Sequence, residues 1–340
     1  MNTIQAHELT MARTAATTPL MHYEPSQDLT QWQAAAKAKL EELLCLPLQS
    51  CEDCYTVTST EDTDTYHAIN FEFQSEPGYF IPCHLLIPLG ATKPLPTVIS
   101  IQGHSTGKHI TMGKKKFERD TDSTLRTRDF AVQAIREGMC ALVFDQRYMG
   151  VSGHQQDGNP HCLDGFSPLA ASLWGRTAIG ERVWDIMRIL DVMEKHLTAH
   201  VDMDKIICLG NSGGGTATFY ASCMEPRIRV SVPSCAVSTY EASIMAMHHC
   251  ACNYIPHIRR FFEMGDLGCL IAPRRLVMVS GALDKIFPIE GAKASFEIIK
   301  SAYDKIGHPE RCHMVIGSGG HQFYPDEAWP VIHTMLEQED

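Results

Sequence analysis

The segment from Lys205 to Ser222 constrains the fold more than any other part of this chain of 340 residues. A short apolar run leads into Gly210-Asn211-Ser212-Gly213-Gly214, and small residues compatible with a helix follow. A G-x-S-x-G pattern between a strand and a helix holds the serine on a strained turn, so that its hydroxyl projects above the sheet. The segment therefore predicts a strand, a turn and a helix, with Ser212 as a candidate nucleophile.

A glycine-rich turn of this kind also has a non-catalytic interpretation. Such turns bind phosphate at the N-terminus of the helix, or they simply allow strand and helix to pack closely. The pentapeptide alone does not separate these interpretations from catalysis. Because a serine hydroxyl is a poor nucleophile at neutral pH, the deciding sign is a base and an acid placed in the expected order further along the chain.

The rest of the chain alternates between apolar runs and helical periodicity. Continuous apolar runs predict buried strands at 97–103, 140–145, 230–236, 275–281 and 313–316. Helical spacing predicts helices at 130–138, 181–197, 289–303 and 329–337. Two alternating segments, 66–73 and 79–88, predict antiparallel strands at the edge of a sheet. The fold class is therefore α/β, with a mostly parallel central sheet and helices on both faces.

The domain organisation follows from length and pattern. At 44% apolar and 20% charged residues the composition is that of a globular protein with a sizeable core, and α/β folds often hold 250 or more residues around one sheet. We expect residues 1–50 to form an N-terminal arm and a docking helix, the helix lying at 29–46. Residues 51–340 then form one catalytic domain. Irregular stretches around 105–128, 154–180 and 241–268 predict cap-like insertions.

The net charge and the cysteine content indicate which partners and which compartment to expect. The formal net charge of −11 repels nucleic acid and anionic membranes, so we expect neither as a partner. The thirteen cysteines are odd in number and scattered along a long chain, which indicates reduced thiols rather than a disulfide framework. No signal-peptide pattern and no apolar run of eighteen residues is present, which favours a cytoplasmic location. The oligomeric state is open, and a homo-oligomer is compatible with the sequence.

A carboxylate and a histidine follow Ser212 in the order that an activated serine requires. Asp284 comes just after the apolar run 275–281, and His321 lies in a glycine turn after the last predicted strand. We assign Ser212 as the nucleophile, His321 as the general base and then acid, and Asp284 as the carboxylate that orients the histidine. Two alternatives stay open. Asp284 could merely cap the next helix, and Glu241, which follows the preceding strand, is a rival acid.

The oxyanion that forms during acyl transfer needs two backbone donors. The amide of Gly213 lies at the start of a helix, where N–H groups are unpaired and the helix dipole favours negative charge. The second donor is expected from the loop after the strand at 97–103, which reads Gln102-Gly103-His104. The amide of His104 therefore pairs with that of Gly213 in this interpretation, and its side chain could line the site. Gly103 could instead mark only a tight turn.

Other clusters of polar residues favour structural roles. His248-His249-Cys250-Ala251-Cys252 does not have the spacing of a zinc motif, and adjacent histidines cannot easily face one ion. We therefore predict packing or pocket lining there, with no metal and no cofactor. Asp145, Arg147 and Arg182 are expected to form ion pairs or hydrogen bonds around the site.

With these residues placed, the chain resembles the α/β-hydrolase superfamily over residues 30–338. Within it, the chain is similar to the acetyl xylan esterase and dienelactone hydrolase-like carboxylesterases, on the segments 32–47, 102–104, 145–150, 175–185, 265–267 and 271–274. The resemblance implies an α/β-hydrolase fold and an esterase acting on short acyl esters, acetylated sugars among them. Ser212 stands where dienelactone hydrolases carry cysteine, and the oxyanion loop reads Gln-Gly-His rather than His-Gly-x.

The leading hypothesis is a cofactor-free serine carboxylesterase whose partner is a small-molecule ester. Two alternatives remain. A serine peptidase could use the same fold, although the chain lacks the large propeller that restricts access in prolyl peptidases. A non-catalytic ligand-binding homologue is the other, and loss of ester turnover in Ser212→Ala would separate it from the enzyme.

Overall fold

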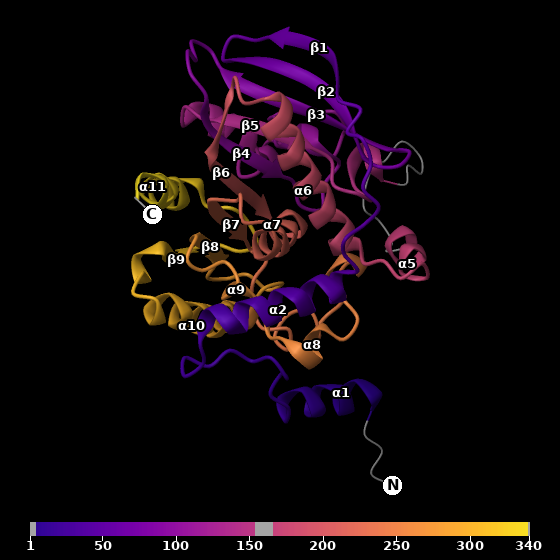
Figure 1. Ribbon diagram of the computed structural model, residues 1–340, viewed down its shortest axis with the longest axis vertical. Helices are drawn as coiled ribbons and strands as arrows, with labels where there is room; N and C mark the ends of the chain where they lie inside the picture. Colours follow the sequence, from indigo (N-terminus) through magenta and orange to yellow (C-terminus); the bar gives the residue numbers. More distant parts are fainter. Residues whose placement is uncertain (1–4, 154–165, 339–340) are drawn as a thin grey trace.

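A computed structural model describes residues 5–153 and 166–338, and its centre is one nine-stranded sheet (Figure 1). The strand order is β1-β2-β3-β5-β4-β6-β7-β8-β9. The strands β4 to β9 all run parallel to one another, whereas β1, β2 and β3 pair antiparallel at one edge. The bounds of the strands are β1 Thr56–Asp62, β2 Tyr66–Glu76, β3 Tyr79–Pro88, β4 Leu95–Ile101, β5 Cys140–Phe144, β6 Val201–Asn211, β7 Val230–Ser234, β8 Arg275–Gly281 and β9 Cys312–Gly317.

The parallel strands lie in the middle of the molecule because both of their faces are covered. Every residue of β5, β7 and β8 is buried, which explains why these segments read as continuous apolar runs rather than as alternation. The predicted mostly parallel sheet of an α/β protein is confirmed. Since parallel strands end at the same edge of a sheet, the loops that follow β4, β6, β8 and β9 meet at one end of the molecule.

The first helical layer contains the docking helix and the helices around the nucleophile turn. It comprises α2 Leu29–Leu44, α6 Ala178–His196, α7 Gly213–Met224, α9 Met264–Gly268 and α10 Ile289–Lys305 (Figure 1). Helix α2 begins where the Asp28 side chain accepts a hydrogen bond from the amide of Gln31. Its buried residues Trp32, Leu40 and Leu44 belong to the same core cluster as Val183 and Leu190 of α6, although their positions in the chain are far apart.

The second layer covers the opposite face of the sheet with α4 Phe130–Arg136 and α11 Pro325–Glu337. Phe130, Phe323 and Trp329 pack edge to face within the second core cluster. The two layers on opposite faces of the sheet confirm the predicted arrangement. Helix α11 begins four residues before the predicted start at 329.

The N-terminal arm contains a helix that the sequence analysis did not predict. Residues Ala6–Ala15 form helix α1, whose side chains are mostly exposed, and weak periodicity explains why the sequence did not reveal it. The segment after it is anchored to the body: the amides of Leu20 and Met21 donate to the carbonyls of Arg260 and Phe261. Tyr23 is buried, and its amide donates to Asp266.

The antiparallel edge also holds one strand more than predicted. All seven residues of β1 are exposed, so the segment has no alternation between buried and exposed positions.

The predicted insertions consist of short elements. The stretch 105–128 holds a 3-10 turn, η1 Lys108–Ile110, and the helix α3 Asp122–Leu125. Stretch 241–268 holds η3 Ala251–Asn253, α8 Ile258–Phe261 and α9. In 154–180, residues 154–165 lie outside the described residues; η2 Gly150–Ser152 precedes them, and α5 Phe166–Ser172 follows. The last 3-10 turn, η4 Pro309–Arg311, precedes β9. None of the described helices is long and apolar enough to span a bilayer.

Candidate active site

Ser212 stands on a sharp turn between β6 and α7, as the sequence predicts. Its backbone lies at φ 57° and ψ −125°, a conformation that a non-glycine residue adopts only under strain. Its amide donates to the carbonyl of Ser234 on β7, and its carbonyl accepts from the amide of Thr216, so both sides of the turn are held. A Cβ atom on Gly214 would lie 2.2 Å from the carbonyl oxygen of Ile101, so only glycine lets α7 approach β4 this closely.

His321 and Asp284 come together at the ends of the last two strands. His321 Nδ1 lies 2.8 Å from Asp284 Oδ2, while Asp284 Oδ1 accepts from the amides of Ile286 and Phe287. Burial alone would raise the pKa of Asp284. The hydrogen bond and charge of His321, together with these amides, outweigh burial and hold the pKa below its ordinary value. The carboxylate is therefore ionised at neutral pH, as required to orient an imidazole and to stabilise its protonated form.

Ser212 and His321 line one cavity of about 660 Å³. His321 Nε2 is buried and has no hydrogen-bond partner among the described residues, so Ser212 Oγ is not bonded to it here. Catalytic hydrogen bonds are often long in ligand-free structures and tighten when substrate binds. The imidazole is thus held at Nδ1 and available at Nε2. The described lining residues are His104, Arg128, Leu169, Ser212, Gly213, Thr216, His248, His249, Cys250, Ala251, Asn253, Tyr254, Ile286, Phe287 and His321.

The loop after β4 passes directly beside the serine. A Cβ atom on Gly103 would lie 3.1 Å from Ser212 Cβ, and a Cβ atom on Gly213 would lie 2.8 Å from Nδ1 of His104. The imidazole of His104 therefore lies against the start of α7, where the first helical amides have no acceptor within the helix. The two predicted oxyanion residues, His104 and Gly213, line the same cavity as Ser212.

Buried polar residues fix this loop in place. Gln102 Nε2 and the amide of Lys108 both lie 2.7 Å from Asp145 Oδ1, and Gln146 Nε2 donates to the carbonyl of Gln102 at 2.6 Å. Burial raises the pKa of Asp145, an effect that the charge of Lys108 and backbone amides oppose. Asp145 thus has the structural role that the sequence predicts, as an acceptor that joins the loops after β4 and β5.

Arg147 also has the predicted structural role. Its guanidinium makes two hydrogen bonds of 2.8 Å to Asp185 and one of 2.6 Å to Glu76, all buried beside α6. Arg182 donates to the carbonyl of Arg147 at 3.1 Å. The rival acid Glu241 is half-buried on the loop after β7, whereas the described carboxylate that contacts His321 is that of Asp284.

Several residues at the site carry no motif that sequence reasoning could have found. The ring of Phe287 stacks on His321 with centroids 6.0 Å apart, which helps to fix the imidazole plane. Cys235 lies beside the same pair, and burial, with the charge of Asp284 next, raises the pKa of its thiol to about 12. Arg128 lines the cavity without an ion-pair partner among the described residues. These three residues lie on loops, and the path of a loop cannot be predicted from periodicity in the sequence.

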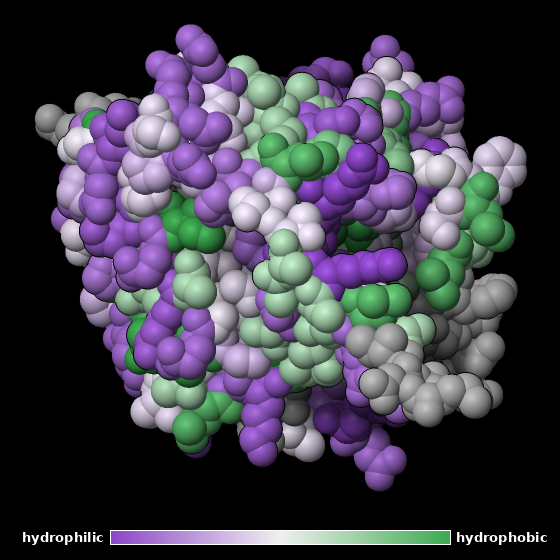
Figure 2. Space-filling model, turned by 90° about the horizontal axis from the view of Figure 1, so that it is seen from below, coloured by the Kyte–Doolittle hydropathy of each residue, from purple (hydrophilic) through white to green (hydrophobic). Residues whose placement is uncertain are grey.

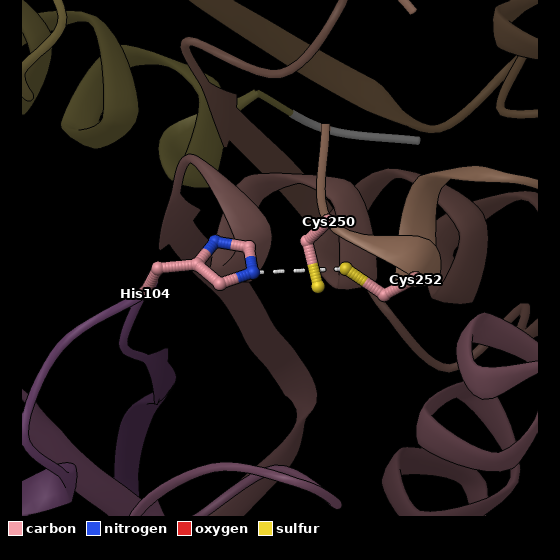
Figure 3. A group of neighbouring side chains, drawn as sticks. All are labelled: His104, Cys250 and Cys252. Carbon is pink, nitrogen blue, oxygen red and sulfur yellow. Dashed lines mark hydrogen bonds between the residues drawn. The ribbon is translucent and has the colours of Figure 1, made fainter. Parts of the chain in front are cut away.

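Residues 248–251 line the cavity, as predicted, and Cys252 is buried next to them. His249 is buried, its Nε2 lies 3.3 Å from Ser243 Oγ, and its ring packs against Phe287. Burial lowers its pKa, so His249 is neutral at physiological pH. Cys250 and Cys252 instead lie beside His104, and Cys252 Sγ is within hydrogen-bonding distance of its Nε2 (Figure 3). This last grouping is not visible in the local sequence.

The parallel sheet, the strained serine turn after β6 and the histidine after the last strand define a protein of the α/β-hydrolase class. More particularly, the chain belongs to the Abhydrolase family, which residues 10–317 match.

The chain is similar to known proteins in sequence and in fold. YtaP of Bacillus subtilis, a provisionally named hydrolase, is 24% identical over 243 residues, covering 71% of this chain and 77% of YtaP. A structure from Bacteroides fragilis, provisionally named an acetyl xylan esterase, superposes with a TM-score of 0.79 at 18% identity and covers 97% of this chain and 84% of its own. A glucuronoyl esterase from Solibacter usitatus superposes with a TM-score of 0.69 at 15% identity, covering 94% and 97%.

Proposed function

We propose that this protein is a serine carboxylesterase. One observation carries the proposal. Ser212, on its strained turn, lines the same cavity as His321, whose Nδ1 is hydrogen-bonded to the buried carboxylate of Asp284. This arrangement of nucleophile, base and orienting acid is the one that acyl transfer requires. The names of two structural neighbours, an acetyl xylan esterase and a glucuronoyl esterase, support an ester of a sugar as the substrate class.

In the proposed mechanism, Ser212 Oγ attacks the ester carbonyl while its proton passes to His321 Nε2. The negative charge on the carbonyl oxygen is stabilised by the amides of Gly213 and His104, each worth about 3 kcal/mol of the barrier. The protonated imidazole then gives its proton to the leaving alcohol as the C–O bond breaks. Water, deprotonated by His321, releases the acid from Ser212 and restores the enzyme. Asp284 stays ionised throughout.

The charges that line the cavity bear on the substrate. Arg128 is among the described lining residues, and none of these residues is a carboxylate. Burial lowers the pKa of Arg128, a sign of the cost of keeping its charge out of water, yet no arginine loses its charge at neutral pH. We therefore expect short acyl esters, acetyl esters of sugars among them, and a preference for those that also carry a negatively charged group.

The test is hydrolysis of p-nitrophenyl acetate and of a panel of acetylated and uronic-acid methyl ester sugars by the wild type and by Ser212→Ala. We expect turnover to fall in the variant by a factor on the order of 10⁶. A folded wild-type protein that hydrolyses no ester in the panel would contradict the proposal and favour a ligand-binding homologue. Cleavage of a peptide amide faster than any ester would favour the peptidase alternative.

A further inference from the structure

Three ligand atoms for a soft metal ion converge on the wall of the cavity. His104 Nε2, Cys250 Sγ and Cys252 Sγ all lie within 4.8 Å of one another, and Cys252 Sγ is 3.8 Å from His104 Nε2. Figure 3 shows the imidazole and the two sulfurs directed toward a common point from two different loops. His104 follows β4, whereas Cys250 directly precedes η3 and Cys252 lies within it, 148 positions after His104.

The spacing of these atoms suits tetrahedral coordination. With Zn–S bonds of about 2.3 Å and a Zn–N bond of about 2.0 Å, ligand atoms around one ion are separated by about 3.5–3.8 Å. The separation of 3.8 Å between His104 Nε2 and Cys252 Sγ is close to this range, and all three ligand atoms lie within 4.8 Å of one another.

The local sequence gave no reason to expect this set. The spacing of His248, His249, Cys250 and Cys252 does not match a zinc motif, and adjacent histidines cannot easily share an ion. In the folded protein, the histidine next to the cysteines is His104, from the loop after β4, which contacts Cys252. His249 instead contacts Ser243 and Phe287.

We propose that His104, Cys250 and Cys252 form a binding site for a single Zn²⁺-type cation, with the fourth position open to the cavity. Sulfur and imidazole ligands select zinc or cadmium over magnesium and calcium, which prefer oxygen. Two thiolates cancel the charge of a divalent ion. Such a neutral centre can therefore form in the cavity that Arg128 also lines, where the guanidinium would repel a bare cation.

A zinc ion bound at this site should affect ester hydrolysis, an expectation that rests on the proposed function. His104 and Cys250 line the cavity together with Ser212 and His321. An ion held there with its own water would occupy the space that an ester needs, and it would hold His104 away from any contact with substrate. We expect zinc to inhibit ester hydrolysis reversibly, with recovery when a chelator is added.

The experiment measures metal binding directly, without ester turnover. Full-length protein is treated with chelator and a phosphine reductant, freed of chelator, and titrated with ZnCl₂ by equilibrium dialysis with metal quantification. We expect one tightly bound zinc per chain. Cys250→Ser and Cys252→Ser should each weaken binding by about 100-fold or more, because loss of a direct ligand exceeds the 10- to 100-fold loss typical of supporting residues.

Cys54→Ser is the matched control. Cys54 is exposed and forms the pair Cys51-x-x-Cys54 outside the cavity, so it tests whether other thiols capture the ion. Its affinity for zinc should equal that of the wild type. Co²⁺ in place of Zn²⁺ provides a second readout, because thiolate ligation gives absorption bands that Cys250→Ser and Cys252→Ser should remove. Zinc should also raise the unfolding temperature of the wild type, a measurement that needs no variant.

The proposal is wrong if the reduced wild type takes up no stoichiometric zinc, if either cavity cysteine can be replaced without loss of affinity, or if Cys54→Ser abolishes binding. An absence of ester hydrolysis would contradict only the proposed function, because binding is measured independently. If zinc binds as expected but leaves ester hydrolysis unchanged, the site stands and its inhibitory effect is refuted.

Discussion

His321 shows how much chemistry depends on a single side chain in this molecule. Nδ1 is hydrogen-bonded to Asp284, the ring stacks on Phe287, and Nε2 has no hydrogen-bond partner among the described residues. An imidazole fixed in this way presents an acceptor to a serine hydroxyl only in the tautomer that carries its proton on Nδ1. The proposed mechanism therefore depends on the carboxylate of Asp284, which accepts a hydrogen bond from Nδ1 and so favours this tautomer.

Asp284→Asn should lower kcat for ester hydrolysis by about 10⁴-fold, because an amide in place of the carboxylate favours the wrong tautomer and no longer stabilises the imidazolium. The measurement is steady-state kinetics on p-nitrophenyl acetate, with circular dichroism to confirm folding. Glu241→Gln is the matched control and should keep wild-type activity. Loss of activity in Glu241→Gln, with Asp284→Asn active, would exchange the roles of the two acids.

Arg128 provides a test of substrate charge. Arg128→Gln should reduce kcat/KM for p-nitrophenyl hemisuccinate, which carries a free carboxylate, by about 10- to 100-fold, since a hydrogen bond to a charged group contributes about 1.5–3 kcal/mol. Hydrolysis of neutral p-nitrophenyl acetate should change little. Arg126→Gln is the control, because Arg126 is exposed on the same loop and lines a different cavity. Equal losses on both esters would show that Arg128 does not read charge.

The sequence anticipates some of these residues and not others, for a physical reason. Ser212, Asp284 and His321 each follow a buried strand, and parallel strands carry whatever follows them to the same edge of the sheet. Their proximity could therefore be predicted. Arg128 and Phe287 reach the cavity through the course of irregular loops, which no periodicity encodes.

At the scale of elements, the insertion 105–128 is held by one buried carboxylate. Asp120 accepts hydrogen bonds from Thr106 at 2.5 Å and from the amides of Lys116 and Phe117 at 2.8 Å, and it lies 2.8 Å from His109 Nε2. Burial by itself would raise the pKa of Asp120. These donors outweigh burial and lower the pKa to about 2.

This lowered pKa predicts a specific dependence of stability on pH. Because the folded state favours the ionised carboxylate, its contribution is complete above about pH 4 and is lost as the pH falls toward about 2. We expect Asp120→Asn to lower the free energy of unfolding by about 2 kcal/mol at pH 7. The difference from the wild type should shrink in urea unfolding at pH 3.5. Asp64→Asn, at an exposed turn, should show no such trend, and a constant difference in Asp120→Asn would contradict the role.

Elements with a strong period could be predicted, and elements without one could not. The buried strands β4, β5 and β8 have continuous apolar runs, and α6 and α10 have a clear apolar face, so their approximate positions follow from sequence. Strand β1 and helix α1 are almost entirely exposed. Because few of their side chains are buried, their sequences show no apolar periodicity from which a strand or a helix could be predicted.

At the scale of the whole molecule, the N-terminal segment has two parts of unequal importance. Figure 2 shows the end of the molecule at which α1 lies, where hydrophilic residues separate small hydrophobic groups. Helix α2, by contrast, places Leu40 and Leu44 at 0% exposure in the principal core. The arm is therefore a surface element, and the docking helix is part of the folded body.

Leu40→Ala should lower the free energy of unfolding by about 2–5 kcal/mol, the range for a leucine removed from a core. Leu9→Ala on α1 is the matched control; Leu9 is 36% exposed, and we expect a change within about 0.5 kcal/mol. Chemical denaturation of both variants is the measurement. Similar values for the two would mean that α2 does not belong to the cooperative unit.

Strand β1 has a consequence for how these molecules meet in solution. It forms one outer edge of the sheet, and its residues Thr56–Asp62 end in Glu61 and Asp62. A free sheet edge can template the addition of a strand from another chain, and acidic side chains on that edge oppose the approach of an identical, equally acidic copy. We therefore expect the acidic end of β1 to disfavour growth of the sheet at this edge.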